Sequence, residues 1–270
     1  MIKNKLMIVR GAGDLATGVI HRLWNAGFPV IILETEQPAA IRRQVSLCEA
    51  AYEGSACVEG VTARRAADPA DAMDILSGGE IPLLIDPAGI LIPMLRPDAL
   101  IDAIMAKRNL GTSRAMAPLT VALGPGFCAG SDVDYVIETC RGHNLGRIIT
   151  SGEALPDTGI PGIIAGYGAQ RVIHAPASGI LRACHAIGDH ISCGESVAII
   201  ETSRGEIPVP ATLDGLLRGL IRDGFPVKEG LKIADIDPRR SEYDNCFTIS
   251  DKARCIAGSV LEIICSRCLP

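Results

Sequence analysis

The 270-residue sequence predicts an α/β domain with a parallel sheet, followed by a small all-β barrel. Three observations support this fold class. Hydrophobic residues make up 48% of the chain but aromatic residues only 3%, a composition typical of buried parallel strands covered by helices. A glycine-rich turn near the start separates a strand pattern from a helix pattern. Near the end, two glycine-marked hairpin patterns repeat each other.

The first glycine turn belongs to a strand–helix–strand pattern. Residues 5–9 are mainly apolar and lead into Gly11-Ala-Gly-Asp-Leu-Ala16, after which apolar residues recur at helical spacing up to residue 25. A second apolar strand over residues 28–33 is closed by Glu34. This order predicts a Rossmann-like domain that binds a dinucleotide.

The residue types in the turn suit a pyrophosphate. Gly11 allows the tight turn, Gly13 lets the ligand approach the backbone, and Ala16 lets helix and strand pack closely. Glu34 is placed to accept hydrogen bonds from ribose hydroxyls. The cofactor-binding candidates here are Gly11, Ala12, Gly13, Asp14, Ala16 and Glu34. Asp14 is unusual because a carboxylate repels a pyrophosphate unless a cation intervenes; it could instead cap its own helix.

A second glycine loop follows the apolar strand over residues 119–123. It contains Gly124 and Gly126 and leads into a dense group of charged residues. We expect the loop to share one cleft with the first turn, because parallel strands end at the same edge of a sheet. Asp86 and Glu138 are expected at this edge, with Asp86, Gly124 and Gly126 as further cofactor-binding candidates; the catalytic candidates are Asp132, Arg141 and His143. The alternative is that these charges pair on a solvated surface.

The alternation of strands and helices continues to a glycine- and proline-rich stretch. A strand is expected over residues 81–85 and helices over 68–76 and 97–107. Periodicity disappears between residues 150 and 168, which sets the domain boundary. The predicted divisions are a nucleotide-binding domain (1–168), a barrel (169–240) and a C-terminal segment that packs back on the first domain (241–270).

The barrel prediction rests on an internal repeat. Gly179, Gly188 and Gly194 recur as Gly215, Gly224 and Gly230, so the offset is 36 residues (215 − 179). Two such hairpins cannot each bury a face alone, but they can pack about a pseudo-twofold axis. The repeat resembles the biotinyl/lipoyl-type barrel, whose modified members carry a lysine in the turn between the halves. Residues 201–209 contain no lysine, so neither biotin nor lipoate is expected.

Composition argues against several classes of partner and site. The formal net charge is −5 and no basic stripe is present, so nucleic acid is not an expected partner. No apolar run reaches the ~20 residues of a membrane helix and the start lacks a signal-peptide pattern, so a cytoplasmic location is expected. The ten cysteines include Cys184, Cys193, Cys265 and Cys268, but no set of four converging ligands is evident and no metal site is predicted.

Several longer strings resemble one protein family. They are Arg10–Gly18, Glu49–Gly54, Ile85–Pro87, Ala106–Thr112, Leu123–Phe127, Arg141–His143, Gly146–Arg147, residues 158–162, Asp235–Arg239 and Ile249–Arg254. The family is that of the accessory proteins of selenium-dependent molybdenum hydroxylases (YqeB-like), distantly similar to XdhC-type maturation factors of xanthine dehydrogenase.

The resemblance implies a maturation protein that handles a molybdenum cofactor carrying a sulfur or selenium ligand. Its partners would be a xanthine dehydrogenase-like molybdenum hydroxylase and other maturation factors, and the chain could also form a homo-oligomer. The turn would then hold a nucleotide or a molybdopterin dinucleotide. Two alternatives are an NAD(P)-dependent oxidoreductase and a non-catalytic adaptor that docks through its barrel. Whether the protein is an enzyme is left open.

Overall fold

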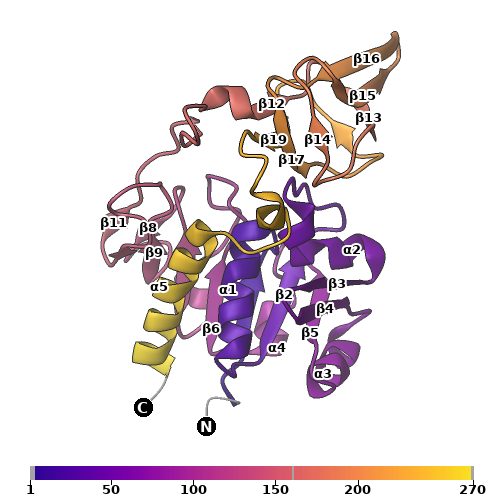
Figure 1. Cartoon of the computed structure of the whole chain (residues 1–270). Coiled ribbons are helices and arrows are strands. Elements are labelled where there is room, and N and C mark those ends of the chain that lie inside the picture. Colours follow the sequence, from indigo (N-terminus) through magenta and orange to yellow (C-terminus); the bar gives the residue numbers. More distant parts are fainter. Residues whose placement is uncertain (1–3, 160, 269–270) are drawn as a thin grey trace. The chain divides into compact units, whose positions relative to one another are not determined.

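This computed structural model describes residues 4–159 and 161–268 (Figure 1). Residues 1–3, 160, 269 and 270 lie outside the described residues, although they fall within the predicted divisions 1–168 and 241–270 and residue 160 falls within the string 158–162. The chain forms two compact units. Unit 1 comprises Met1–Pro38, Ser46–Thr158 and Ile249–Pro270, and unit 2 comprises Ala39–Val45 and Gly159–Thr248. Both units draw on separate segments, whereas the predicted divisions were contiguous.

Unit 1 is built on a nine-stranded sheet in the order β10-β9-β7-β6-β1-β2-β5-β4-β3. Its strands are β1 (Met7–Arg10), β2 (Val30–Glu34), β3 (Ser55–Val58), β4 (Val61–Arg65), β5 (Ile81–Ile85), β6 (Ala99–Asp102), β7 (Thr120–Leu123), β9 (Tyr135–Ile137) and β10 (Ile148–Ile149). β8 (Cys128–Ala129) and β11 (Gly152–Glu153) form a separate two-stranded sheet. The seven inner strands are parallel, but β3 and β10 pair antiparallel at the two edges.

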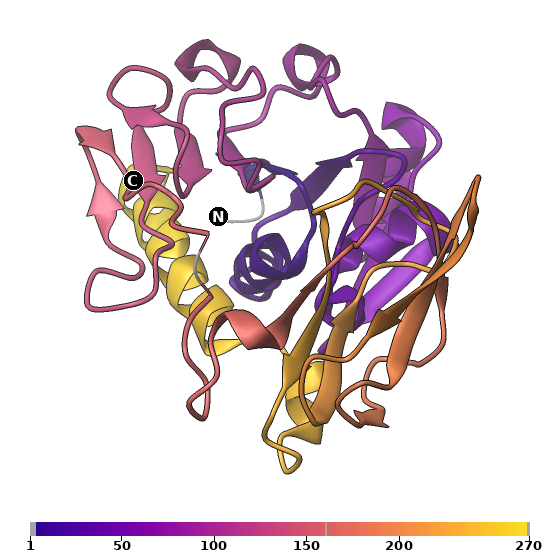
Figure 2. The same ribbon diagram turned by 90° about the horizontal axis from the view of Figure 1, so that it is seen from above.

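The helices of unit 1 are α1 (Asp14–Asn25), α2 (Ala50–Glu53), α3 (Pro69–Ser77), α4 (Ile92–Leu95) and α5 (Asp251–Cys268). Alternate residues of the central strands, such as Ile8, Ile31 and Leu100, pack with residues of α3 and α4 in one hydrophobic cluster. α5 lies beside α1 in both ribbon views (Figures 1 and 2). Among the described residues, no helix combines the length and apolar character needed to cross a membrane.

Unit 2 preserves the sequence repeat in its strands. They are β12 (Val172–His174), β13 (Gly179–Ala183), β14 (His190–Ile191), β15 (Ser196–Thr202), β16 (Gly205–Pro210), β17 (Gly215–Leu220), β18 (Pro226–Val227) and β19 (Lys232–Asp237). The starts of β13, β14 and β15 recur 36 residues later in β17, β18 and β19 (215 − 179, 226 − 190, 232 − 196). The two halves exchange strands, because β14 pairs with β17 while β18 pairs with β13.

Close backbone approach explains the first glycine of each repeat. A Cβ atom at Gly179 would lie 2.3 Å from the carbonyl oxygen of Glu201, and one at Gly215 would lie 2.4 Å from that of Asp237. Only glycine fits such a contact, since real Cβ atoms do not approach backbone oxygens this closely. Equivalent leucines, Leu181 and Leu217, are fully buried in the core of this unit.

The predicted fold class is wrong in two respects. The sheet of unit 1 is mixed rather than parallel, because short antiparallel strands extend both edges. The strands of unit 2 form two four-stranded antiparallel sheets, β12-β19-β17-β14 and β16-β15-β13-β18, and not a closed barrel of the biotinyl/lipoyl type. The expected helix over residues 97–107 is also wrong, since residues 99–102 form the central strand β6. A buried apolar run of only three residues, Ala99 to Ile101, fits either element when periodicity is the only guide.

Candidate functional site: the carboxyl edge of the unit 1 sheet

The seven parallel strands of unit 1 end at one edge of the sheet, here called the carboxyl edge, and six of them lead into the candidate site. They are β1, β2, β5, β6, β7 and β9, and they end in or run directly into Arg10, Glu34, Asp86, Asp102, Gly124 and Glu138. Ligands of open α/β sheets bind at this edge, because the loops and helix N-termini that follow the strands gather there. Most of the residues predicted as a site therefore lie at the same edge.

The first glycine turn joins β1 to α1 at this edge. Gly11 has φ +90°, and a Cβ atom there would lie 3.0 Å from the carbonyl oxygen of Ala103, so this position requires glycine. Gly13 is the N-cap residue of α1, and a Cβ atom there would meet no atom within 4 Å. The space beside Gly13 is thus open to a ligand.

The start of α1 differs from the starts of the other two long helices. The Asp68 side chain accepts hydrogen bonds from Ala70 and Asp71 N–H at the start of α3, and Ser250 Oγ accepts one from Ala253 N–H at the start of α5. Gly13 provides no such side-chain bond. The first backbone N–H groups of a helix have no partner within the helix, and together with the helix dipole they attract anions. Part of this capacity is already taken, because Leu15 N–H donates to Asp14 Oδ1 at 2.9 Å.

Glu34 packs directly against the turn. Its Oε2 accepts a hydrogen bond from Ala12 N–H at 2.8 Å, and its Oε1 accepts one from Thr35 N–H at 2.7 Å. Burial raises the pKa of this carboxyl group, while the two N–H groups act in the opposite direction. Each carboxylate oxygen has a second lone pair, so Glu34 can still accept bonds from ligand hydroxyl groups.

A buried charge network supports the turn from the strand side. Arg10 is 1% exposed and donates to Thr112 Oγ1 at 2.5 Å and to the carbonyl oxygen of Pro87 at 2.7 Å. Thr112 in turn donates to Asp102 Oδ2, which lies 3.8 Å from the Arg10 guanidinium. Burial raises the pKa of Asp102, and its hydrogen bonds and Arg10 oppose that rise. The network ties β1, β6 and the loops after β5 and β6 into one rigid base.

The segment at residues 46–49 covers the other side of the turn. Cys48 N–H donates to the carbonyl oxygen of Ala12 at 2.9 Å, and Leu47 N–H donates to Thr17 Oγ1 at 2.9 Å. Burial, followed by the nearby carboxylates of Glu34, Glu49 and Asp14, raises the pKa of the Cys48 thiol well above its ordinary value. Cys48 therefore stays protonated at neutral pH and is a packing residue rather than a nucleophile.

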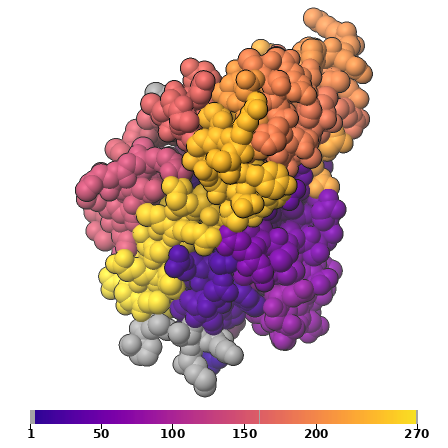
Figure 3. All heavy atoms as spheres, in the orientation of Figure 1, coloured from indigo at the N-terminus to yellow at the C-terminus, as the bar shows by residue number. Residues whose placement is uncertain are grey.

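The start of α5 lies beside the start of α1. A Cβ atom at Gly18, near the start of α1, would lie 2.8 Å from the Cβ of Ala253, near the start of α5. The space-filling view shows atoms of α5 (yellow) adjoining those of α1 (indigo) (Figure 3). Two helix N-termini, each the positive end of a helix dipole, thus lie together at the carboxyl edge.

Lys252 brings a cation to this point. Burial and then the positive charge of Arg141 lower the pKa of Lys252, whereas the carboxylate of Asp14 acts to raise it. Arg141 forms a two-bond ion pair with Asp251, with nitrogen–oxygen distances of 3.0 and 3.1 Å. The charges of Arg141 and Asp14 thus both act on Lys252, and a lysine crowded by a like charge gains from a bound anion.

The second glycine loop is packed by the chain itself. A Cβ atom at Gly126, which has φ +102°, would lie 2.6 Å from the backbone of Arg108, and one at Gly124 would lie 2.6 Å from Thr139 Oγ1. These glycines permit close packing between loops. They leave no open space comparable to that at Gly13.

Three predicted acidic site residues hold their own loops. Asp86 accepts hydrogen bonds from Ile90 and Leu91 N–H, Asp132 accepts one from Cys128 N–H, and Glu138 accepts bonds from Cys140 and Leu155 N–H. Asp132 also lies before the start of β9, whereas Arg141 and His143 follow the end of β9. His143 is exposed. Of the predicted catalytic residues, Arg141 lowers the pKa of Lys252 through its charge, and Asp14 of the first turn acts on the same lysine.

The cysteines give no sign of a metal centre. All ten are free thiols, and among residues 4–159 and 161–268 no group of three or more His, Cys, Asp or Glu side chains is placed to hold a metal ion. Sequence reasoning missed Lys252, although the residue lies within one of the strings that carry the family resemblance. The Ser250-Asp-Lys start of α5 signals a capped helix, but nothing in its spacing places that helix beside α1.

Unit 1 is thus an α/β unit with an anion-attracting carboxyl edge. In sequence, the chain is similar to "Uncharacterized protein YqeB" of Escherichia coli (strain K12), with 50% identity over 262 residues. The match covers 97% of this chain but 47% of YqeB, so the chain spans about half the length of that relative. No family model matches. The predicted resemblance to YqeB is confirmed at this level, while the distant similarity to XdhC-type factors finds no support.

The solved structures matched have other names. They include a succinylglutamate desuccinylase/aspartoacylase from Rhodobacter sphaeroides, with 16% identity, coverage of 87% of this chain and 86% of that chain, and a TM-score of 0.30. Another is the ectoine utilization protein EutE (DoeB) from Ruegeria pomeroyi, with 13% identity, coverage of 86% and 84%, and a TM-score of 0.27. TM-scores this low give no basis for assigning an activity of those proteins to this chain.

The predicted function is not borne out by these matches. None of the proteins named above carries the name of a molybdenum hydroxylase or of a maturation factor, and the solved structures are named for desuccinylase, aspartoacylase and ectoine-utilization proteins. The prediction of a maturation protein for selenium-dependent molybdenum hydroxylases is therefore corrected, and it is not carried further. The predicted alternatives, an NAD(P)-dependent oxidoreductase and a docking adaptor, gain no support from the matches either.

Proposed function

We propose that unit 1 binds a pyrophosphate-containing dinucleotide of the NAD type, with the pyrophosphate at residues 11–15. One observation carries the proposal: the N-terminus of α1 has no side-chain cap and lies open beside Gly13, with the start of α5 and Lys252 next to it. Helix N-termini and a lysine together provide the backbone donors and positive charge that a pyrophosphate requires.

Glu34 gives the site a preference among dinucleotides. Its carboxylate is fixed against the turn by Ala12 N–H and keeps acceptor capacity for ribose hydroxyls. A 2′-phosphate would meet this carboxylate as a like charge. We therefore expect NAD(H) to bind more tightly than NADP(H).

Asp14 limits the affinity of this site. Its carboxylate accepts Leu15 N–H at 2.9 Å, so it occupies one of the donors that the pyrophosphate would use. Lys252 compensates part of the negative charge of Asp14. The affinity of the natural chain should accordingly be modest. We expect a dissociation constant between micromolar and millimolar, which corresponds to a binding free energy of roughly −8 to −4 kcal/mol.

The test is a fluorescence titration of the chain with NADH. Gly13→Val should abolish binding because its side chain fills the open space, and Lys252→Met should weaken it about tenfold, as expected for a lost charge-assisted contact of about 1.5 kcal/mol. Asp14→Asn should strengthen binding, because it removes a repulsive charge. Asp14→Asn should raise the affinity for NADH, whereas the other two substitutions lower it. General damage to the fold would lower the affinity of all three variants and cannot produce this pattern.

Matched controls are available in the chain. Gly258 lies within α5 and, like Gly13, has no atom within 4 Å of an added Cβ, so Gly258→Val controls for the glycine replacement. Lys228→Met removes an exposed lysine from unit 2. The proposal fails if NADH at millimolar concentration neither changes its fluorescence nor raises the melting temperature, since even weak binding stabilises a folded protein by mass action.

A further inference from the structure

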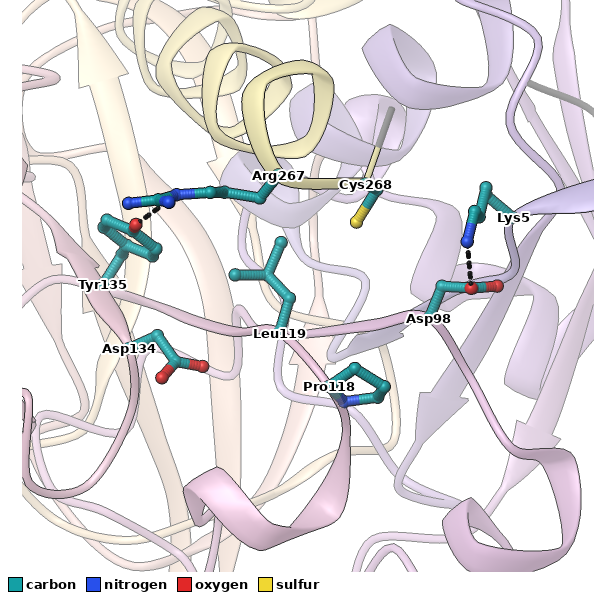
Figure 4. A pocket seen from close by; sticks show the side chains of 8 residues that line it. All are labelled: Lys5, Asp98, Pro118, Leu119, Asp134, Tyr135, Arg267 and Cys268. Carbon is teal, nitrogen blue, oxygen red and sulfur yellow. Dashed lines mark hydrogen bonds and ion pairs between the residues drawn. The ribbon is translucent and has the colours of Figure 1, made fainter. Parts of the chain in front are cut away.

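A pocket lies at the opposite edge of the same sheet, where the parallel strands begin. It has a volume of about 330 Å³ and is lined by Lys5, Asp98, Pro118, Leu119, Asp134, Tyr135, Arg267 and Cys268 (Figure 4). These residues precede or begin β1, β6, β7 and β9, or end α5. The glycine turn lies at the other end of the strands, so this pocket is a separate site and does not depend on the proposed dinucleotide.

Both carboxylates of the pocket already have cationic partners. Asp98 accepts a hydrogen bond from Lys5 Nζ at 2.9 Å and one from Leu6 N–H. Asp134 pairs with Arg114 at 2.8 Å and also accepts bonds from the backbone and side chain of Thr120. These two ion pairs cancel in charge, so they leave neither a strong anionic site nor a metal ligand set.

Arg267 is the cation that remains. Its Nε donates to Tyr135 Oη at 2.7 Å, and its Cζ lies 5.7 Å from the centre of the Tyr135 ring. Among the described residues it has no carboxylate partner, so its terminal nitrogens still have donors to offer. The cation–π contact and the Nε hydrogen bond restrict the guanidinium, which lowers the entropic cost of binding a ligand.

The surface between the charged groups is apolar. Figure 4 shows Leu119 between the Arg267–Tyr135 pair on one side and the Lys5–Asp98 pair on the other, with Pro118 beside it and the Cys268 sulfur facing the same space. Burial and then the charge of Asp98 raise the pKa of the Cys268 thiol, so this group is neutral at pH 7. A neutral thiol adds to the apolar lining and does not repel an anion.

We propose that this pocket binds a small monocarboxylate with a branched aliphatic body, whose carboxylate pairs with Arg267 and whose body packs on Pro118 and Leu119. A planar guanidinium matches a carboxylate with two parallel hydrogen bonds. Arg114, which pairs with Asp134, is not among the lining residues; with Arg114 included, the ion pairs cancel and Arg267 leaves a net charge of about +1, which fits a single negative charge. Its volume lies at the lower end for small-molecule sites, which suits a ligand of few atoms.

The proposal can be tested by calorimetric titration of the full chain with 4-methylpentanoate at pH 7. Arg267→Met should weaken binding at least tenfold, because a charge-assisted bond is lost. The affinity of Arg267→Lys should lie between that of Arg267→Met and that of the natural chain, since lysine keeps the charge but loses the paired donors. Arg267 is exposed, so the melting temperature should change little.

Two comparisons make the test decisive. The neutral 4-methylpentanamide should bind at least tenfold more weakly than the carboxylate, and Arg22→Met, which removes an exposed arginine at the end of α1, should leave affinity unchanged. Equal binding of acid and amide would overturn the proposal, as would full affinity in Arg267→Met. Loss of carboxylate binding in Lys252→Met would place the ligand at the glycine turn and overturn it as well.

Discussion

Gly13 and Gly126 each lie in a loop that follows a buried strand of the same sheet, yet an added Cβ atom meets very different surroundings at the two positions. At Gly13 it meets nothing within 4 Å, whereas at Gly126 it lies 2.6 Å from the backbone of Arg108. The first loop is open to a ligand and the second is closed by the chain itself. A glycine-rich loop after a strand therefore indicates a close backbone approach, but not whether the approaching group is a ligand or another loop.

The largest effect that separates the two loops should come from alanine substitution. Gly126→Ala places a Cβ against backbone and also forces a residue with a side chain to φ +102°, so we expect it to lower the free energy of unfolding by about 2 to 4 kcal/mol. Gly13→Ala, at φ −65°, should change it by less than about 1 kcal/mol. Urea denaturation of both variants measures the difference. Equal losses would show that the two loops are packed alike.

A smaller effect should appear in the pH dependence of stability. Burial raises the pKa of Glu34, so the folded state favours its neutral form. Its contribution to the free energy of unfolding is then greatest below the unfolded pKa of about 4.3 and is lost as the pH rises through the raised, folded value. As the pH rises from 4 to 7, the free energy of unfolding of Glu34→Gln should therefore fall less than that of the natural chain. Urea denaturation at each pH measures both.

Glu59 serves as the control with the opposite sign. Burial acts to raise the pKa of Glu59, but the Ile249 N–H and Arg254 outweigh it, and the pKa is lowered. Its contribution to stability is therefore present above the unfolded pKa of about 4.3 and is lost as the pH falls through the lower, folded value. Glu59→Gln should be less stable than the natural chain at pH 7 and approach it at low pH. Parallel curves for both variants would contradict the assignment of opposite shifts.

The smallest effect should come from Arg108. Gly126 packs against the backbone of residues 107–108, and the Arg108 side chain is exposed. Arg108→Ala should therefore change the free energy of unfolding by less than about 0.5 kcal/mol, as is usual for exposed surface positions. A loss comparable to that of Gly126→Ala would mean that the side chain, and not the backbone, holds the second loop closed.

Much of unit 1 could be predicted from local patterns. The strand, glycine turn and helix at the start are predicted from residues 5–25, and Glu34 was expected to end the next strand, as it does. Strand β6 was predicted as part of a helix, because three apolar residues followed by Asp102 carry no periodicity that distinguishes the two elements. The short antiparallel edge strands also carry little signal, since β10 has only two residues.

The sequence by itself determined the repeat of unit 2, because glycines 36 residues apart mark the same close backbone contact in each half. It also determined the glycine turn at Gly13 and the helix that follows it, since glycine spacing and helical periodicity are local features; that the turn is open was decided by the tertiary structure. Only the tertiary structure decided which charges meet. The charge of Asp14 acts on Lys252 because α5, the last helix of the chain, packs against α1, the first. Such contacts depend on hydrophobic packing between distant segments, which no local spacing records.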